Sequence, residues 1–476
     1  MSTKRKILIA LLVLILAVAA LGAWLLRGNT ADYSVSEVTG TEPLLADPEA
    51  ESFPTVAIAD PIGWKDGEVP AAAEGLAVSR FADGLDHPRV IHTLPNGDVL
   101  VTLTRAPASE GPGGIQGWIA GILFEKAGSA GASPEQLVLL RDSDGDGAAE
   151  TRKVLRDDLE SPSGIEWADG KLYVANHNAV LSFDYELGAD AVTGKATKLM
   201  DLPPGGGHWM RNLALSPDGS QLYVAVGSVS NIGEKGMEIE KGRAAIHELD
   251  VQSGKSRLFA TGLRNPNGLA FNPWSGELWT TVNERDMLGS DLVPDYLTNV
   301  PVGVNYGWPW FYYRDNVDDR VKAPMPSMVA GYVRRPEYAL GPHVAALGMV
   351  FTEQGSRMGD AFGNGAFIAR HGSWNRKPPS GYDLIYVAFD ERGNPQGKPV
   401  EVLGSFLTSG GDTRGRPTWV DWAADGALLM SDDTAGIIWR VIAANAKPAT
   451  APALFETESL PPRRNLVDPR SGRRDQ

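Results

Sequence analysis

Two short segments of the sequence hold side chains that could carry chemistry. His208 follows the glycine run Gly205–Gly207, where the backbone can approach a ligand closely. Arg264 and Asn265 lie in the turn Thr261–Leu269 (TGLRNPNGL), whose proline and Asn-Gly pair would hold a guanidinium ready for a carboxylate or another planar anion. A lone histidine is more often a structural hydrogen-bonding group, and such an arginine could equally form a salt bridge. The glycines, and a position ahead of a strand, favour a functional His208.

A second set of polar residues stands at the ends of short apolar runs. Singly, each is an ordinary loop residue. Together they would supply donors, cations and a few carboxylates, which suits a flat ligand with several negative charges. The set comprises Asn176–His177, Asn283–Arg285 with Glu284, His371–Arg376 (HGSWNR) with Trp374, Arg414, Arg416 and Asp432–Asp433.

The acidic segment Asp142–Glu150 (DSDGDGAAE) has the spacing of a calcium-binding loop. Asp142, Asp144 and Asp146 match the start of an EF-hand loop. The glutamate expected at the twelfth position is missing, because Lys153 stands there. Two interpretations stay open: a structural Ca2+ site built on the three aspartates, or a turn between strands that holds no metal.

A repeated phrase indicates which elements position these residues. Each copy reads as strand, glycine-containing turn and strand, the strongest short-range signal for a hairpin. One hairpin cannot bury its own apolar face, so a repeated hairpin predicts a radial array, here an all-β, six-bladed propeller. Residues that flank the strands then converge on one face. The copies are His87–Thr102, Ser161–Asn176, Arg211–Ser228, Asn265–Glu284, Ala346–Ser373 and Arg416–Asp433.

Two insertions break the rhythm of the repeats. Arg105–Leu137 is rich in glycine and is predicted to be a surface loop. Asp286–His343 holds an aromatic cluster of Tyr306, Trp308 and Trp310–Tyr313. Long ordered loops are often functional, so this cluster could contact a ligand, cover one end of the array, or do both.

Composition limits the class of protein. The 476 residues carry a formal net charge of −15, and no basic stripe in the body suggests nucleic acid as a partner. The chain has no cysteine, which excludes disulfides, thiolate metal sites and covalent attachment of c-type haem. It also lacks the common nucleotide-binding, esterase and zinc-protease motifs.

The two ends of the chain differ from its body. Lys4–Lys6 precede the apolar run Ile7–Leu26, which is long enough to cross a bilayer as a helix. We expect residues 1–27 to form an uncleaved inner-membrane anchor, although Ala17–Ala19 resembles a cleavage site. The basic residues place the N-terminus in the cytoplasm and the body in the periplasm. We expect a tether over residues 28–74 with a docking strand at Ser52–Ile58, the propeller over 75–443, and a flexible tail over 444–476.

Several motifs, in this order, resemble the sorbosone dehydrogenase branch of the soluble quinoprotein sugar dehydrogenases. The resemblance covers about Gly75 to Val441 and implies a six-bladed propeller that binds pyrroloquinoline quinone on its axis, with Ca2+ beside it. It implies oxidation of a sugar hydroxyl or hydrated aldehyde. The motifs are GGGHW (Gly205–Trp209), SPDGSQLYVAVGS (Ser216–Ser228), GLRNPNGLAF (Gly262–Phe271), NYGWPW (Asn305–Trp310), HGSWNR (His371–Arg376), GRP (Gly415–Pro417) and SDD (Ser431–Asp433).

The resemblance also implies residue roles. His208 matches the general base. Arg264 and Asn265 match a cofactor-binding pair, and Asn283–Arg285 falls where the family places contacts to cofactor and calcium, with Glu284 a candidate for both. Arg416, and less closely Arg414, match arginines that hold cofactor carboxylates. His371–Arg376 lies where the glucose-oxidising branch keeps a cofactor-binding lysine, which makes His371, Trp374 and Arg376 candidates.

Two departures from the glucose-oxidising branch concern the histidine. Gly207 replaces an aspartate before it, and Gly227-Ser228 stands where an aspartate orients it. Another group must therefore hold the imidazole, or the base is weaker. Without a built-in c-type haem, electrons must pass to an external acceptor, a cytochrome or a membrane quinone.

Two other functions remain open. A lactonase-like hydrolase would use one axial metal and a carboxylate such as Glu284 or Asp433 to activate water. A non-catalytic propeller would bind partners or glycans. The arginines and the aromatic loop argue against the hydrolase, whereas the departures around His208 keep the binding propeller possible.

Overall fold

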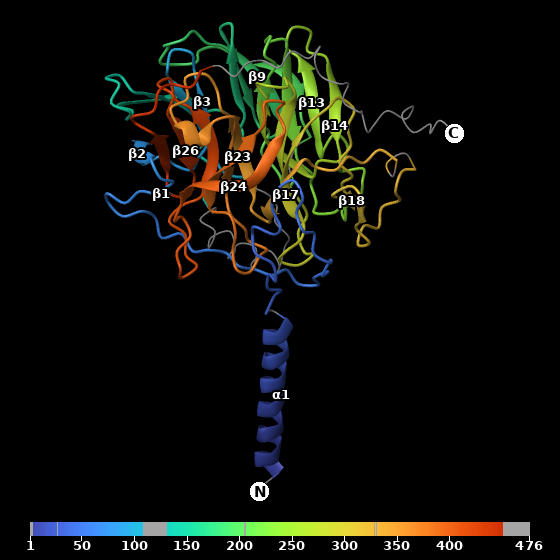
Figure 1. The fold of residues 1–476 in the computed structure, drawn as a ribbon. Coiled ribbons are helices and arrows are strands. Elements are labelled where there is room, and N and C mark those ends of the chain that lie inside the picture. Colours follow the sequence, from blue (N-terminus) through green and yellow to red (C-terminus); the bar gives the residue numbers. More distant parts are fainter. Residues whose placement is uncertain are drawn as a thin grey trace.

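Six antiparallel sheets, each starting with one of the repeats, surround a central axis in the computed structural model (Figure 1). The structure describes residues 3–25, 27–107, 131–203, 206–327, 329 and 331–450. Each predicted hairpin supplies the first two strands of one blade, so the predicted six-bladed propeller is confirmed. The turns form where expected because glycines such as Gly97 and Gly276 adopt positive φ angles of 89° and 68°.

The blades follow the chain in order. The first three comprise β3 (Pro88–Thr93), β4 (Val99–Leu103), β5 (Gln136–Arg141) and β6 (Thr151–Arg156); β7 (Ile165–Ala168), β8 (Lys171–Ala175), β9 (Ala179–Asp184) and β10 (Thr197–Asp201); and β11 (Leu213–Leu215), β12 (Gln221–Val226), β13 (Ala245–Asp250) and β14 (Ser256–Thr261). The last three comprise β15 (Asn265–Phe271), β16 (Leu278–Asn283), β17 (Pro294–Asn299) and β20 (Tyr338–Pro342); β21 (Ala346–Phe351), β22 (Gly365–Arg370), β23 (Asp383–Phe389) and β24 (Pro395–Gly404); and β25 (Pro417–Trp422), β26 (Leu428–Asp432), β27 (Ile437–Ile442) and β2 (Ala77–Ala82).

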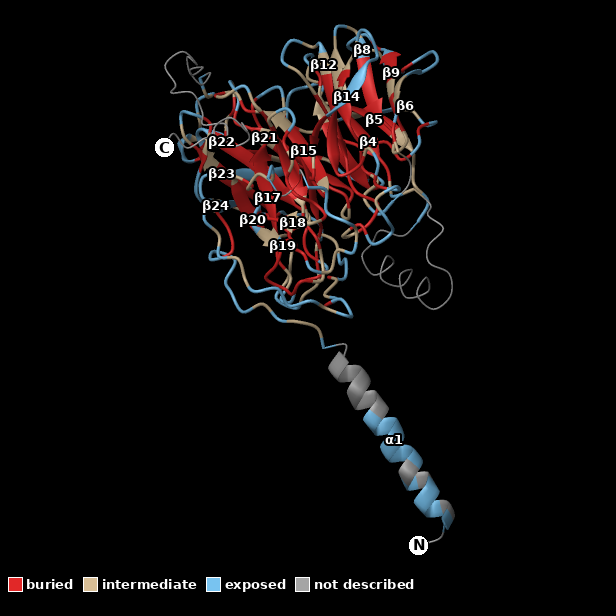
Figure 2. Cartoon of the chain, turned by 90° about the vertical axis from the view of Figure 1, so that its right-hand side faces the viewer, coloured by how far each residue is buried: buried red, intermediate tan, exposed pale blue. Residues whose placement is uncertain are grey.

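The ring is closed by strands from both ends of the propeller. β2, which precedes the first blade, pairs antiparallel with β27, with Ala77 opposite Ile442. The innermost strands also contact one another in a full circle, from β3 through β7, β11, β15, β21 and β25 back to β3. The inner edges of the blades are short and face the axis, and the buried residues lie within and between the blades (Figure 2).

Hydroxyl groups tie neighbouring blades together near the axis. Ser163 Oγ donates to the carbonyl of Arg211 at 2.8 Å, and Thr281 Oγ1 donates to that of Leu347 at 2.6 Å. Ser431 Oγ donates to the carbonyl of Arg89 at 2.6 Å and so joins the last blade to the first. These bonds fix the register between blades at the end of the axis where the polar residues gather.

Residues 27–74, predicted to be a tether, pack along the propeller instead. Val38 and Thr39 are fully buried, and Gly40 forms an isolated bridge with Ala339. Trp64 packs edge-on against Phe406 and Trp439, with ring centroids 5.2 and 5.4 Å away. The two-residue strand β1 (Ala71–Ala72) adds to β24. Ser52–Ile58 docks through side-chain and single backbone bonds without forming a strand. Because the apolar residues of this segment show only weak periodicity, its contacts with the propeller could not be predicted from the sequence.

The insertion Asp286–His343 also differs from its prediction. It contains β17 and β20, the outer strands of the fourth blade, and a small hairpin of β18 (Phe311–Tyr312) and β19 (Asn316–Val317). Its aromatic rings are mostly core residues: Tyr306 is 1% exposed and packs against Tyr296. The aromatic cluster therefore supports the blade rather than presenting a stacking surface. Most of the other predicted loop, 108–130, lies outside the described residues, as does the tail from 451.

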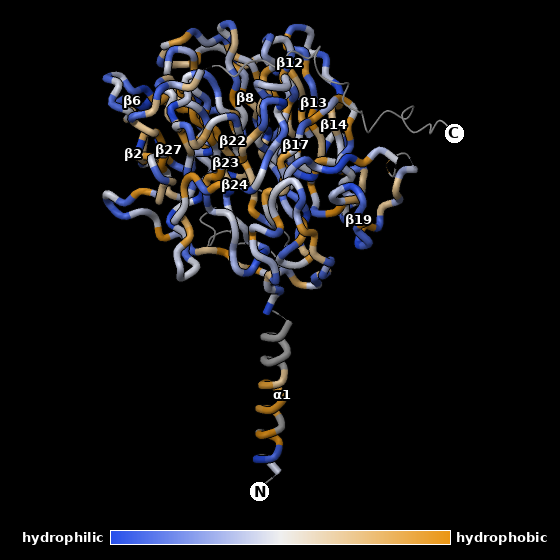
Figure 3. Tube along the Cα trace, in the orientation of Figure 1, coloured by the Kyte–Doolittle hydropathy of each residue, from blue (hydrophilic) through white to orange (hydrophobic). Residues whose placement is uncertain are grey.

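A single long helix, α1 (Thr3–Leu25), precedes the propeller and stands clear of its body (Figure 1). Its exposed side chains include Ile7, Leu12 and Leu16, and the hydropathy colouring is apolar along much of it (Figure 3). Across the part of the chain that the structure describes, no helix meets the length and hydropathy of a membrane span. The predicted helix is confirmed, and the predicted membrane anchor is not.

Candidate functional site

The candidate site lies where the innermost strands begin. In the antiparallel hairpins the first residue of an inner strand faces the last residue of the second strand, as Asn265 faces Asn283, Ala346 faces Arg370 and Pro417 faces Asp432. Residues just before one strand and just after the other therefore share one end of the axis, here called the mouth. Inner strands β3, β15, β21 and β25 bulge in their first residues, a feature common at rims beside active sites.

His208 stands at the mouth ahead of β11. Its Nδ1 lies 2.9 Å from the carbonyl oxygen of Ser228 and 3.1 Å from the Ser228 hydroxyl. A carbonyl can only accept, so Nδ1 carries the proton and Nε2 keeps its lone pair. Burial, assisted by the positive charge of Arg264, lowers the pKa of His208 to about 3. The imidazole is therefore neutral at neutral pH and has the tautomer of a base at Nε2.

Ser228 supplies the group that the sequence left unassigned. Its hydroxyl donates to the carbonyl of Ser230 at 2.7 Å, so the hydroxyl oxygen can only accept from His208. The carbonyl and hydroxyl of Ser228 thus hold the imidazole without the aspartate of the glucose-oxidising branch. Gly227 matters for the same geometry, because a Cβ there would lie 2.6 Å from His208 Cβ and 2.3 Å from Asn265 Oδ1. His208 and Asn265 therefore flank Gly227 closely.

Arg264 lies at the mouth, but its guanidinium donates its hydrogen bonds to other groups of the protein. Nε donates to the Asn231 carbonyl at 3.1 Å, and Nη2 donates to Asn231 Oδ1 at 2.9 Å and to Asp286 at 3.0 Å. Nη1 donates to the carbonyls of Glu284 at 2.6 Å and Asn283 at 3.5 Å. All five donors of the guanidinium are engaged, so Arg264 orders the loops around His208 instead of offering a free fork to a ligand.

The other predicted residues of the fourth blade gather beside Arg264. Asn265 Nδ2 donates to Asn283 Oδ1 at 3.1 Å, and Asn283 Nδ2 donates to the Ala346 carbonyl at 2.7 Å. The carboxylate of Glu284 is 3% exposed and accepts from Arg285 Nε at 2.9 Å. That pairing turns the Glu284 carboxylate away from a metal and from activating water.

A second cluster centres on Asp433, which is buried at the end of the sixth blade. His371 Nε2 lies 3.0 Å from its carboxylate, His87 Nε2 lies 3.6 Å away, and Arg89 donates to it. Burial alone would raise its pKa, but the charges of these three partners hold the pKa of Asp433 well below its usual value. Burial lowers the pKa of His87 to about 4. Asp433 is thus an ionised structural anchor, so neither carboxylate proposed for a hydrolase is free.

Arg416 lies at the mouth and has two unused donors. Its side chain is buried, and its guanidinium carbon lies 5.4 Å from the centre of the Tyr382 ring. Among the described residues neither Nε nor Nη2 has a hydrogen-bond partner. A buried guanidinium without acceptors is costly, so these donors point to an anionic ligand.

Three predicted residues are not brought to this group. Arg376 pairs with Asp291 at 3.1 Å and donates to the Pro378 carbonyl, which places it against the N-terminal segment. Trp374 is 39% exposed. Arg414 donates to the Ser405 carbonyl, lies over Trp64 and has its Nε 3.8 Å from Glu68, so its contacts are with the N-terminal segment and the loop before β25.

Sequence reasoning missed several residues of the site. Asn231 and Asp286 both accept hydrogen bonds from Arg264. His343 Nδ1 lies 3.4 Å from the Asp286 carboxylate. Burial opposes ionisation of Asp286, but the charges of Arg264 and His343 lower its pKa. Arg89 could have been predicted from the sequence. His-Pro-Arg stands at the start of the first repeat, much as Arg-Asn-Pro stands at the start of the fourth. Asn231 lies in a loop without any repeat pattern.

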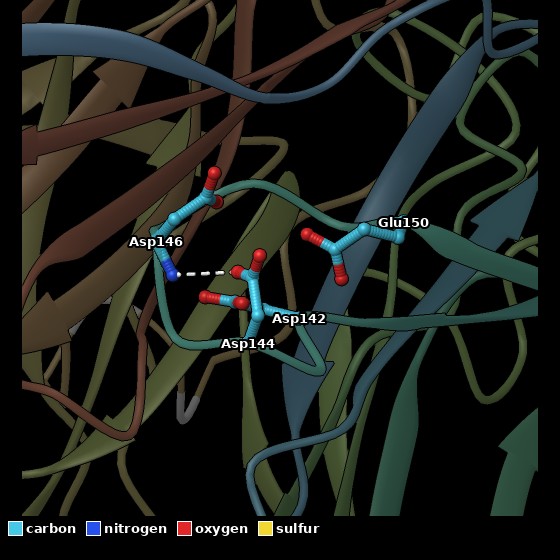
Figure 4. A group of neighbouring side chains, drawn as sticks. All are labelled: Asp142, Asp144, Asp146 and Glu150. Atoms are coloured by element: carbon cyan, nitrogen blue, oxygen red, sulfur yellow. Dashed lines mark hydrogen bonds between the residues drawn. The ribbon is translucent and has the colours of Figure 1, made fainter.

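The acidic loop after β5 lies apart from the mouth. The carboxylates of Asp142, Asp144 and Asp146 converge with that of Glu150, and their oxygens lie within 4.8 Å of one another (Figure 4). Glu150 was not among the predicted ligands. The loop amides also bond these aspartates, as Gly145 does to Asp142 at 2.7 Å. Both interpretations made from the sequence fit this loop, and calcium binding there stays a prediction.

Comparisons with known proteins agree with this fold. An uncharacterized protein of Borreliella burgdorferi is 28% identical over 296 residues, which cover 60% of this chain and 76% of that protein. A pyrroloquinoline quinone-dependent pyranose dehydrogenase of Coprinopsis cinerea is 25% identical over 62% of this chain, and the match spans 48% of that enzyme's length. A Trichoderma reesei structure of the carbohydrate-active enzyme family AA12 superposes with a TM-score of 0.63 at 21% identity, covering 78% of this chain and 97% of that one.

The family assignment rests on a match to most of the propeller. The pattern of the TrAA12-like family matches residues 135–301 and 326–444, which is more than half of the chain. These residues include His208, Arg264, Asn283 and Arg416, the groups around which the mouth is built. The chain therefore belongs to the TrAA12-like family.

Proposed function

We propose that this protein is a dehydrogenase that oxidises a sugar hydroxyl or hydrated sugar aldehyde with pyrroloquinoline quinone as its cofactor. The observation that carries the proposal is the pair of unpartnered nitrogens on buried Arg416, at the same mouth as neutral His208. The similarity to the pyrroloquinoline quinone-dependent pyranose dehydrogenase of Coprinopsis cinerea supports the cofactor and the substrate class.

The residues at the mouth fit a flat tricarboxylate. Arg416 offers Nε and Nη2, and Arg89 Nε likewise has no partner within the described ranges. Charge-assisted bonds from such groups to carboxylates are the strong ones. The carboxylates of Glu284 and Asp433 are taken by Arg285 and Arg89. If Ca2+ accompanies the cofactor, these two paired carboxylates would not be its ligands.

In the proposed reaction the protein itself supplies a general base, His208, which is already oriented. When bound, the quinone supplies the acceptor for the two electrons that leave the substrate carbon. His208 accepts the proton of the substrate hydroxyl at Nε2 while its Nδ1–H keeps donating to Ser228. The positive charge of the resulting imidazolium is offset by Asp286, which lies in the same cluster.

The low pKa of His208 gives this proposal a pH signature. A base whose pKa is about 3 stays unprotonated as the pH falls through 6.5, the usual value for imidazole. We expect kcat/KM for sugar oxidation to show no acid limb near pH 6.5 and to stay nearly flat down to about pH 4. A steady-state profile from pH 8 to pH 4, with the cofactor saturating throughout, measures this. A limb centred at 6.5 would show an ordinary, solvated imidazole.

The function itself is tested by adding the cofactor to the purified full-length chain. With pyrroloquinoline quinone and Ca2+ present, we expect a bound-quinone absorbance spectrum that changes when an oxidisable aldose or polyol is added. Reduction of an electron-accepting dye should follow the same substrates. A chain that binds no quinone with Ca2+ present is not this dehydrogenase.

Two further proposals concern the surroundings of the enzyme. We propose a separate electron acceptor, a cytochrome or a membrane quinone, because no cysteine is available to attach a c-type haem. We also propose that the propeller works in the periplasm, on the basis of the basic residues and apolar run at the N-terminus.

A further inference from the structure

The turn Ser228–Ile232 is held by two glutamates that lie outside the mouth. Glu240 accepts from the amides of Val229 at 2.8 Å and Ser230 at 3.0 Å, and also from the Ser230 hydroxyl. Glu234 accepts from the amides of Asn231 at 3.2 Å and Ile232 at 2.8 Å. Four consecutive backbone donors are thus satisfied by two carboxylates.

Two residues of this turn hold two side chains of the proposed site, His208 and Arg264. Its first residue, Ser228, provides the carbonyl and hydroxyl that hold His208. Its fourth residue, Asn231, provides the carbonyl and Oδ1 that bind Arg264. A shift of the turn would therefore displace the base and the guanidinium together, although neither of them touches Glu240 directly in these bonds.

The two glutamates differ in burial. Glu240 is 5% exposed, and the positive charge of Arg243 acts on it, while Arg243 itself donates to the carbonyls of Gly227 and Pro203 on either side of His208. Glu234 is exposed to solvent. Removing the acceptor at Glu240 would leave buried amides unpaired, whereas water can replace Glu234.

We propose that Glu240 is a positioning residue for both the base His208 and Arg264, the arginine that orders the loops around it. Its carboxylate fixes the amides of Val229 and Ser230, and the turn in this position aims the Ser228 carbonyl at His208 Nδ1 and Asn231 at Arg264. The catalytic consequence rests on the proposed function, whereas the structural consequence can be measured without any cofactor.

The test compares Glu240→Gln with Glu238→Gln in the full-length chain. Glutamine has the same shape, but its NH2 group cannot accept from an amide. Glu238 lies on the same segment, with its side chain 88% exposed, and is the matched control. The first readout is exchange with water of the His208 Nδ1 proton, followed by NMR on protein with labelled histidine. We expect exchange at least tenfold faster in Glu240→Gln and unchanged in Glu238→Gln.

The second readout uses pyrroloquinoline quinone with Ca2+. In Glu240→Gln we expect kcat to fall about tenfold, at temperatures well below unfolding and with the quinone saturating. Unchanged proton exchange together with unchanged kcat would overturn the proposal. If Glu240→Gln does not fold, Ser230→Ala replaces it with the same expected direction and the same overturning result. A wild-type chain that binds no quinone would refute the proposed function, while the exchange comparison would still decide the role of Glu240.

Discussion

Replacing His208 with alanine should lower kcat by about 10²- to 10⁴-fold, the range that a positioned general base contributes. The variant should keep its quinone affinity, because the unpartnered donors at the mouth belong to Arg416 and Arg89. The loss follows from the tautomer: Nδ1 is committed to Ser228, so only Nε2 can take the substrate proton. Stopped-flow reduction of the bound cofactor by sugar measures the chemical step directly.

A second buried histidine provides the control for that experiment. The pKa of His92 is also lowered by burial, to about 4, but His92 lies along β3 rather than ahead of an inner strand. His92→Ala should change stability more than turnover. If His208→Ala retained turnover within about threefold of wild type, the proton acceptor would have to be another group.

Replacing Arg416 with methionine should weaken quinone binding by about ten- to a hundredfold, since a hydrogen bond to a charged group contributes roughly 1.5–3 kcal/mol. The same change should leave the melting temperature of the cofactor-free protein unchanged or raise it, because it removes a buried cation whose Nε and Nη2 lack acceptors in the described structure. Opposite effects on affinity and stability distinguish a ligand-binding arginine from a structural one. Spectroscopic titration and thermal unfolding measure the two quantities.

Arg414→Met is the matched control, because Arg414 lies two positions away but is engaged by Trp64 and Glu68 of the N-terminal segment. It should leave quinone affinity unchanged. Equal losses in both variants, or a clear loss of stability in Arg416→Met, would contradict the assignment of Arg416 to the cofactor.

The sequence predicts the inner hairpins well and the outer strands poorly. Strands β4 and β26 are buried throughout and flank glycine turns, so their apolar runs are distinct. β6 has exposed residues at three of its six positions, and β17 begins with a proline, so neither stands out. Residues 27–74 show the same difficulty, since their docking depends on scattered contacts such as Trp64 against Phe406.

For the site, side-chain identity predicts candidates but not their partners. His208 could be found because glycines precede it and a strand follows, whereas its orienting group is mainly a backbone carbonyl, which any residue at position 228 would present. Arg264 and Arg416 look alike in sequence, each one or two residues ahead of a proline. Only the fold shows that Arg264 is saturated by Asn231, Glu284 and Asp286 while Arg416 keeps two donors.

The pairing of β2 with β27 has a consequence for how the chain is made. β2 leaves the ribosome before any of the six blades is complete, whereas its partner, Ile437–Ile442, is translated only after the other five blades. At about 5–20 residues per second, the early strand waits tens of seconds with its backbone donors and acceptors unmatched. During that interval the free edge of β2 can pair with other chains, so we expect the nascent chain to need protection from aggregation until β27 is translated.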